Sequence, residues 1–240
     1  LTKQQQNLNL TKQQQNQNLT KQQQILKRNP VCDLVHFIPA LLDAIDEVQH
    51  NVQSKSTLLR FVTSLLSIIY LLPPKLLLIY IKHHQDNPIN QRAVLLRLVN
   101  TLKQFIHKET YPYNWFVLTM FQFKAIQKLI EQITDQIETL VPLCLVTAND
   151  GTQSIAPRDV KFWMSFFRLM FDFVHAKSLA VEKFSPAKQR LVLDEYGDMR
   201  LEICKYIRMT WDKMILSFHL SENSTLSNSS SSSNSTLSNS

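Results

Sequence analysis

Residues 114–141 read NWFVLTMFQFKAIQKLIEQITDQIETLV, and the spacing of their apolar side chains predicts the fold. Apolar residues recur at steps of three and four, which is the period of one face of an α-helix. They are Phe116, Met120, Phe123, Ile126, Ile130, Ile133, Ile137 and Leu140. Charged residues such as Lys124, Lys128 and Glu131 take the other faces. We therefore expect one long amphipathic helix with a single apolar stripe packed on a neighbour and a solvated back.

The same periodicity extends over most of the chain. It predicts further helices at 40–51, 55–72, 74–84, 88–109, 157–180 and 186–218. Asn29-Pro30, Asn87-Pro88 and Ser185-Pro186 each place a capping residue before a proline at a first helical position. Only 2 glycines occur, so the tight turns of a sheet-rich protein are not expected. The predicted fold is all-α: an antiparallel helical stack, either an armadillo-like α-solenoid or an irregular bundle.

The two ends differ in composition from the body of the chain. Residues 1–28 begin with a polar nine-residue repeat, LTKQQQNLN, and residues 221–240 are rich in Ser and Asn. Such segments bury too little apolar surface to offset their ordering entropy, so we predict disordered ends around a helical region at 29–220. Residues 1–28 also contribute much of the formal net charge of +7. The body shows no basic stripe, and we expect no nucleic-acid binding.

The segment at 58–81, LLRFVTSLLSIIYLLPPKLLLIYI, is apolar enough to be compared with a membrane-spanning helix. A spanning helix needs about 20 uninterrupted apolar residues. Pro73-Pro74-Lys75 divides this segment into two shorter pieces. We therefore expect two core helices joined by a tight corner, with a membrane-surface hairpin as the alternative.

No residue pattern predicts chemistry. The 7 histidines form no recognised metal spacing, and the 3 cysteines, Cys32, Cys144 and Cys204, lie far apart without a C-x-x-C pair. We interpret these cysteines as buried reduced thiols. Asp194 and Asp198 are expected to lie on one solvated or ion-paired helix face together with Glu202. We expect no catalytic residue, no metal ligand and no cofactor, so the chain is not predicted to be an enzyme.

The tryptophans and one glycine carry packing predictions. Trp115, Trp163 and Trp211 are expected to be core anchors that each bury about 200 Å². Gly197 lies inside the predicted helix at 186–218. A glycine there would permit the close approach of a neighbouring helix.

Four blocks of residues in the C-terminal half form an ordered set. A Y-P-x-x-W block holds Tyr111, Pro112 and Trp115, and a W-x-x-x-F block holds Trp163 and Phe167. The third block holds Glu182, Phe184, Ser185 and Lys188. The fourth holds Tyr196, Gly197, Asp198, Met199, Arg200, Ile203, Ile207, Arg208 and Trp211. In order and rough spacing these blocks resemble the dedicator of cytokinesis (DOCK) family, with Cys204 in place of a glycine that is usual there.

The resemblance implies a function. DOCK proteins are guanine-nucleotide exchange factors for Rho-family small GTPases, chiefly Rac and Cdc42. The matched blocks resemble the helical, armadillo-like region that precedes the family's DOCKER exchange domain. Because Ser/Asn-rich sequence follows Phe218 here, we expect that exchange domain to be absent from this chain. The chain would then be a helical scaffold segment, in which Asp198 and Arg200 form ion pairs rather than contact a GTPase.

The resemblance also implies partners and a location. It implies a Rho-family GTPase partner through the parent protein, an ELMO-type adaptor, and membrane contact only through other domains. The expected location is the cytoplasm, with recruitment to the plasma membrane. Since the chain begins at Leu1 rather than Met, we expect a fragment or a partial gene product. The alternative is a stand-alone helical-repeat adaptor, which predicts an exposed apolar groove for protein partners.

Overall fold

The computed structural model describes most of the chain between residues 30 and 229. The described residues are 30–50, 55–74, 76, 77, 79, 81, 88–108, 110–112, 114–140, 145–147, 153–155 and 157–229. The predicted disordered end at 1–28 lies outside them, whereas a helix continues to Ser229, into the predicted tail. The domain boundaries stay predictions.

The described chain is helical, as predicted, apart from one short hairpin. Its elements are η1 (Pro30–His36), α2 (Phe37–His50), α3 (Lys55–Leu71), α5 (Pro88–His107), α6 (Phe116–Leu140), β1 (Leu145–Thr147), β2 (Gln153–Ile155), α7 (Pro157–Val174), η2 (Lys177–Leu179), η3 (Val181–Lys183), α8 (Pro186–Tyr196) and α9 (Met199–Ser229). Strands β1 and β2 pair antiparallel, with Leu145 opposite Ile155. The hairpin joins α6 to α7, where no helix was predicted.

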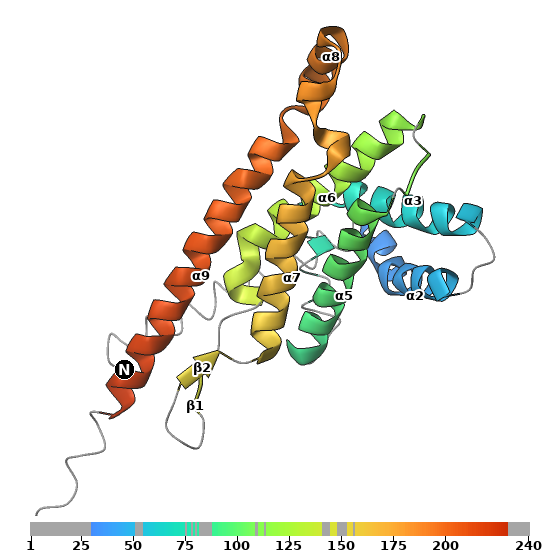
Figure 1. Cartoon of the computed structure of the whole chain (residues 1–240). Helices are drawn as coiled ribbons and strands as arrows, with labels where there is room; N and C mark the ends of the chain where they lie inside the picture. Colours follow the sequence, from blue (N-terminus) through green and yellow to red (C-terminus); the bar gives the residue numbers. More distant parts are fainter. Residues whose placement is uncertain are drawn as a thin grey trace, which may run out of the picture.

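Helix α6 lies at the centre of the stack (Figure 1). It packs against α3 and α9, while α7 packs against both α5 and α9, and α2 lies on α3. Side chains such as Ile126, Ile130 and Ile133 are fully buried between these layers. The apolar periodicity of residues 114–141 therefore does identify the organising helix of the fold.

The prediction of a single apolar stripe on α6 is wrong, because the helix is covered on more than one side. Gln122 and Thr134 are buried together with the apolar residues. Gln122 Nε2 donates to the carbonyl of Phe105 at 3.0 Å, and the hydroxyls of Thr134 and Thr210 lie 3.1 Å apart. Polar side chains can be buried at low cost when they find such partners. Sequence periodicity does not reveal those partners.

The proline corner lies where it was predicted, whereas most of the predicted helix at 74–84 lies outside the described residues. Helix α3 ends at Leu71, and the backbone N–H of Leu76 donates to the carbonyl of Pro73 at 3.2 Å. Leu77 and Ile81, beyond the corner, are buried in the same core as α3. Within the described residues, no helix combines the length and the apolar character needed to cross a membrane.

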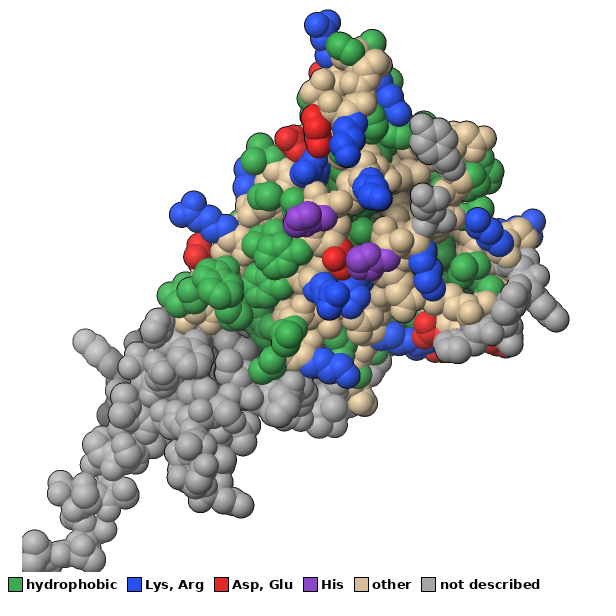
Figure 2. Space-filling view, viewed as in Figure 1, with side chains coloured by type: hydrophobic (Ala, Val, Ile, Leu, Met, Phe, Trp, Pro, Cys, Tyr) green, Lys and Arg blue, Asp and Glu red, His purple; other side chains and the backbone are tan. Residues whose placement is uncertain are grey.

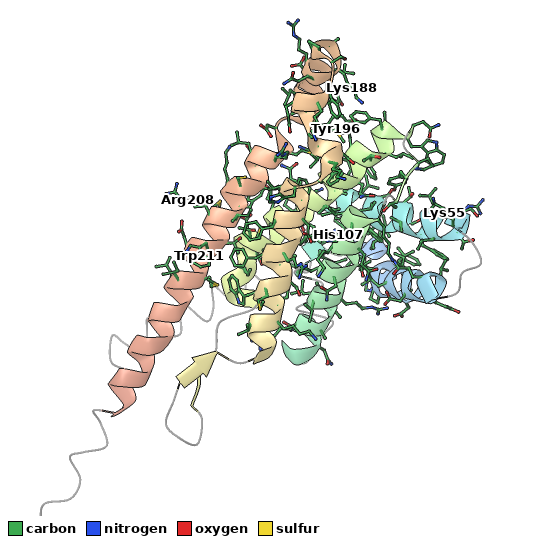
Figure 3. All side chains as sticks on the ribbon, in the orientation of Figure 1. Lys55, His107, Lys188, Tyr196, Arg208 and Trp211 are labelled. Carbon is green, nitrogen blue, oxygen red and sulfur yellow. The ribbon has the colours of Figure 1, made fainter. Side chains whose placement is uncertain are left out.

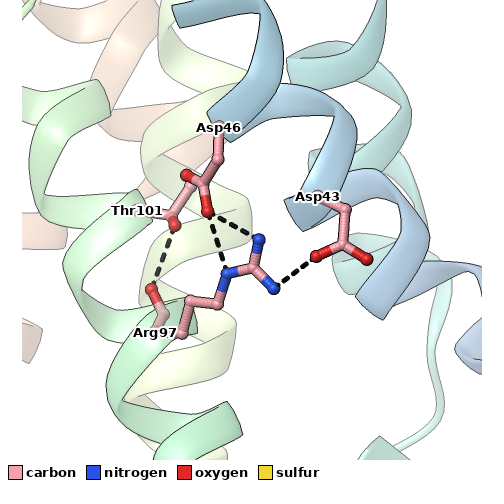
Figure 4. Close-up of polar contacts among 4 residues, drawn as sticks. All are labelled: Asp43, Asp46, Arg97 and Thr101. Carbon is pink, nitrogen blue, oxygen red and sulfur yellow. Dashed lines mark hydrogen bonds and ion pairs between the residues drawn. The ribbon is translucent and has the colours of Figure 1, made fainter. Parts of the chain in front are cut away.

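An ion pair ties α2 to α5 (Figure 4). Arg97 on α5 donates from Nε and Nη2 to Asp46 Oδ2 at 2.9 and 2.6 Å, and from Nη1 to Asp43 Oδ1 at 2.6 Å. Burial lowers the pKa of Arg97, but the hydrogen bonds and charges of the two aspartates outweigh this effect and leave it raised. The arginine stays charged and bridges two carboxylates on one face of α2.

The predicted helix at 186–218 is two helices. Helix α8 ends at Tyr196, and Gly197 has φ 72° and ψ −177° before α9 begins at Met199. Only glycine adopts this backbone region readily, so the residue ends one helix and redirects the chain. The predicted close approach is also wrong, because a Cβ added at Gly197 would meet nothing within 4 Å.

The predicted helix at 157–180 is shorter than expected. Helix α7 ends at Val174, and Ala176 is extended, with φ −61° and ψ 122°, before the 3₁₀ turns η2 and η3. These turns bring the chain from the end of α7 to the start of α8. The junction places the third motif block beside the N-terminal end of α6.

Candidate interaction surface

Helix α7 presents apolar side chains to solvent as well as to the core. Trp163 faces the interior and is 3% exposed, whereas Met164 is 67% and Phe171 48% exposed. Met164, Phe167 and Phe171 follow one another at steps of three and four, so they share one face of the helix. This face lies beside α9.

Helix α9 supplies the opposite wall of a groove. Ile207, Trp211 and Met214 recur at helical spacing, and the Trp211 ring lies edge-to-face on Phe167 with centroids 6.0 Å apart. We call this feature the α7/α9 groove; its volume is about 840 Å³. It is lined by Val160, Trp163, Met164, Phe167, Arg168, Phe171, Cys204, Ile207, Arg208, Trp211 and Met214. Hydrophobic side chains gather over α7 and α9 in Figure 2.

The charged residues of the groove are arginines. Arg168 on α7 and Arg208 on α9 are both exposed, and no carboxylate of a described residue lines the groove. Arg208 and Trp211 lie about one turn apart on α9 (Figure 3). An apolar groove with a cationic rim is complementary to an amphipathic helix that carries acidic residues beside its apolar face.

The second and fourth motif blocks meet in this groove. Trp163 and Phe167 come from one block, and Ile207, Arg208 and Trp211 from the other. Trp163 is a core anchor, as predicted, but Trp211 is not, because 52% of its surface is exposed. Helices α6 and α7 cover other sides of α9 and leave this side open.

The first motif block forms the approach to α6. Tyr111 is buried, and its hydroxyl lies 3.1 Å from Thr63 Oγ1. Burial raises the pKa of Tyr111, and the hydrogen bond with Thr63 offsets part of that rise. The N–H of Trp115 donates to the carbonyl of Pro112 at 2.8 Å. Trp115 is 42% exposed, so the prediction of a core anchor is wrong for this residue, which lies at the exposed entrance to α6.

The third motif block links η3 to α8 and α9. Glu182 accepts two hydrogen bonds from Arg200 Nη1, at 3.1 and 3.2 Å. The pKa of Glu182 is lowered first by a hydrogen bond from its own backbone and then by Arg200. Phe184 packs beneath the ammonium group of Lys188. Ser185 precedes α8, although its side chain makes no capping hydrogen bond.

The rest of the fourth block starts α9. The carbonyl of Tyr196 accepts a hydrogen bond from Lys124 Nζ at 3.1 Å. Met199 and Ile203 are buried. The side chain of Asp198 accepts a hydrogen bond from the N–H of Leu201 at 3.0 Å, so it caps α9. The predicted ion pair is therefore found for Arg200 but not for Asp198.

Asp194 does not share the predicted acidic face with Asp198 and Glu202, whereas the N–H of Glu202 donates to the carbonyl of Asp198 at 3.1 Å, one turn into α9. Asp194 lies on α8 and Asp198 follows the break at Gly197, so the two are not neighbours on one helix. Glu202 on α9 pairs with Lys205 at 2.6 Å. Among the residues that the structure describes, no group of three or more His, Cys, Asp and Glu side chains is arranged to hold a metal ion.

The groove also corrects one cysteine prediction and adds residues that the sequence analysis missed. Cys204 is exposed in the groove rather than buried, and the side chains of Cys32 and Cys144 lie outside the described residues. Met164 and Arg168 were not predicted to be surface residues of interest. Their spacing of four on α7 was the available signal, but it was hidden among apolar residues on nearly every side of that helix.

Comparisons with known proteins agree with the helical architecture. The family model described as the dedicator of cytokinesis (DOCK) TPR region matches residues 3–217. Over 123 residues, or 51% of this chain, the sequence is 26% identical to dedicator of cytokinesis protein 4 of Homo sapiens and of Mus musculus. It is 23% identical to dedicator of cytokinesis protein 3 of Homo sapiens over the same length.

These relatives are far longer than this chain. The matched segment spans 6% of the length of each of them. No solved structure matches the chain.

Proposed function

The chain belongs to the dedicator of cytokinesis (DOCK) family, and from this premise we propose that it is a helical scaffold segment of a DOCK-type guanine-nucleotide exchange factor acting on the Rho-family GTPases Rac and Cdc42. The observation that carries the proposal is the family match over residues 3–217. The packing of the motif blocks supports it, because Trp163, Met199 and Ile203 are buried in one helical core.

The proposed role of the segment is mechanical. Exchange factors act by stabilising the nucleotide-free state of the GTPase, so the exchange site must be held in a defined orientation toward other parts of the protein. A stack centred on a buried helix such as α6 is rigid enough to transmit that orientation. In this proposal the exchange domain lies elsewhere in the parent protein.

We further propose that the α7/α9 groove receives an amphipathic helix from another part of the same parent protein. The relatives contain much more chain than is matched here, so other parts of the parent protein could cover the groove in this proposal. The rim residues Arg168 and Arg208 favour an occupant with acidic residues beside its apolar face. Continuing the stack in this way would bury Met164, Phe171 and Trp211.

The first experiment measures release of labelled GDP from Rac and from Cdc42 in the presence of the purified chain. The expected rate equals the spontaneous rate, because a scaffold segment does not stabilise the nucleotide-free GTPase. Clear acceleration by the chain would refute the assignment as a scaffold without exchange activity. A DOCK exchange domain serves as the positive control.

A second function, the stand-alone adaptor, is favoured by one observation. That hypothesis predicts an exposed apolar groove, and the α7/α9 groove has this character. Cys204 lies in the groove and is a probe for its occupant. In the parent protein an internal helix would slow alkylation of Cys204 relative to the isolated chain, whereas equal alkylation in both would favour the adaptor. A cysteine introduced at exposed Glu195 on α8 is the matched control and should react equally in both.

The partners and the location follow from the same family membership. We propose that the parent protein binds an ELMO-type adaptor and resides in the cytoplasm, with recruitment to the plasma membrane through its other domains. Microscopy of the tagged chain beside the tagged parent tests this proposal. Recruitment of the chain alone would contradict it.

A further inference from the structure

A second hollow lies between the ends of α5 and α6 and the turns that lead to α8, and its charge is strongly one-sided. Its volume is about 630 Å³, within the range of sites for small molecules. Four lysines line it: Lys108, Lys177, Lys183 and Lys188. We call it the lysine cavity. Several Lys and Arg side chains appear on the upper part of the molecule in Figure 2, below α8.

Among the described residues, no ion pair joins these four lysines to a carboxylate. No carboxylate of a described residue lines the cavity. Glu182 is the acidic neighbour of Lys183 and interacts with it through space, but its oxygens are hydrogen-bonded to Arg200. Four ammonium groups around one hollow repel one another, and an anionic ligand would relieve that repulsion.

One of the four lysines is held in position by aromatic rings. Lys188 Nζ lies 3.9 Å from the ring centroid of Phe116 and 4.2 Å from that of Phe184. The two rings pack edge-to-face, with centroids 5.7 Å apart. These contacts orient the ammonium group at the cavity, so less side-chain entropy is lost when a ligand binds. They also give a role to Phe184 and Lys188 of the third motif block.

A buried amide adds a second requirement for the ligand. Gln122 is 3% exposed and lines the cavity. Its Nε2 donates to the carbonyl of Phe105 at 3.0 Å, which fixes the orientation of the amide. Its Oε1 is buried and accepts no hydrogen bond from any described residue. A buried acceptor of this kind is stabilised by a hydroxyl donor, and a fully ionised phosphate, whose oxygens only accept, cannot supply that donor.

We propose that the lysine cavity binds a small phosphorylated polyol. Its phosphate groups pair with the lysines, and one of its hydroxyl groups donates to Gln122 Oε1. The ligand is either a free sugar or inositol phosphate or the headgroup of a lipid, since both present this chemistry. The proposal is independent of the scaffold function, because it depends on none of the residues of the α7/α9 groove.

The test compares two soluble probes of similar charge by titration calorimetry. Inositol trisphosphate carries phosphates and hydroxyls, whereas tripolyphosphate carries phosphates alone. Wild-type protein should bind inositol trisphosphate more tightly, and Gln122→Met should weaken that probe about tenfold while leaving tripolyphosphate unchanged. Equal effects of Gln122→Met on both probes would overturn the assignment of the hydroxyl, and with it the polyol.

A surface variant keeps the test informative if Gln122→Met fails to fold. Lys188→Gln should weaken both probes about tenfold, because it removes one charge-assisted contact. Lys55→Gln, on α3 and far from Lys188 in Figure 3, is the matched control and should leave both affinities unchanged. Equal loss in the two lysine variants would mean a general charge effect and would overturn the site.

Further arms of the test identify the source of the ligand. Binding to vesicles of phosphatidylcholine and phosphatidylinositol bisphosphate that is lost in Lys188→Gln would identify a lipid headgroup. Binding to soluble inositol trisphosphate without binding to those vesicles would identify a free metabolite. Tighter binding of a phosphoserine peptide than of inositol trisphosphate would contradict the polyol proposal.

Discussion

Gly197 shows how one residue changes the path of the chain. Its N–H donates to the carbonyl of Leu193 at 3.0 Å and closes α8, while its φ of 72° and ψ of −177° turn the chain out of the helix. Asp198 then caps α9 through the N–H of Leu201. Two adjacent residues thus end one helix and start the next.

Gly197→Ala should lower the free energy of unfolding by about 1–3 kcal/mol, because any residue with a Cβ is strained in this backbone conformation. A Cβ would meet no neighbouring atom within 4 Å, so the loss reports backbone strain alone. Urea unfolding measures it, with Glu195→Ala on the exposed face of α8 as control. An unchanged free energy in Gly197→Ala would mean that the chain reroutes without cost.

The tryptophans differ in burial, so their truncation should differ in cost. Trp163→Ala should destabilise the protein by about 3–5 kcal/mol, as is typical of a buried aromatic side chain. Trp211→Ala and Trp115→Ala should each cost less than about 1.5 kcal/mol, because these residues keep much of their surface exposed. Chemical unfolding of the three variants tests the order, and equal losses would contradict the burial described above.

Tyr206 makes the free energy of unfolding depend on pH in the alkaline range. Burial, followed by the charges of Glu131, Glu202 and Asp135, raises the pKa of Tyr206 from 10.0 to about 12. The folded state therefore holds the proton more tightly than the unfolded state, and the stability that it gains is full below pH 10.0. That stability is lost as the pH rises from 10.0 to about 12.

Tyr206→Phe should remove this part of the pH dependence. Below about pH 9, the unfolding free energies of wild type and variant should differ by a constant amount. Between about pH 9 and pH 11.5 this difference should change, because the wild type loses more stability than the variant. Parallel curves for the two proteins over this range would contradict the raised pKa.

Packing between elements depends on a few contacts across each interface. Arg97 joins α2 to α5, Thr134 and Thr210 join α6 to α9, and Glu182 and Arg200 join η3 to α9. The apolar layers supply most of the burial, and these polar contacts select one register of the helices among many of similar apolar area. The Arg97 contact is the best placed for measurement, since its three short hydrogen bonds lie at the surface.

A double-mutant cycle with Arg97→Met and Asp46→Asn should give a coupling free energy of about 1 kcal/mol in low salt. High salt should reduce the coupling, because both side chains are partly exposed. Thermal or urea unfolding at two salt concentrations measures it, and Arg60→Met, exposed on α3, is the matched single-variant control. A coupling that is absent at low salt would show that the bridge adds nothing to the docking of α2.

The molecule as a whole is a layered stack with a well-packed centre and a projecting end. Helix α6 is covered by α3, α5 and α9, whereas α8 projects from the stack and packs mainly on η3 (Figure 1). Local stability follows such differences in packing. The α7/α9 groove lies on the outer layer, where the described chain provides no further covering helix.

Hydrogen exchange should therefore be graded across the molecule. Amides of α6 should exchange only through global unfolding, with protection equal to the full free energy of unfolding, while amides of α8 should exchange through local opening. Mass spectrometry of peptides from residues 123–137 and 187–196 measures both. Equal protection of the two peptides would contradict a projecting α8 that opens locally.

The sequence by itself determined the helical class, the prolines that start α5 and α8, the core position of Trp163 and the resemblance to the DOCK family. Apolar periodicity and proline stereochemistry are local properties, and a single chain segment displays them fully. Only the tertiary structure decided that α6 is covered on several sides, that Gly197 divides a predicted helix, and that Trp211 and Cys204 lie in an open groove. These outcomes depend on which helices lie beside each face, and on a backbone angle that a glycine permits but does not dictate.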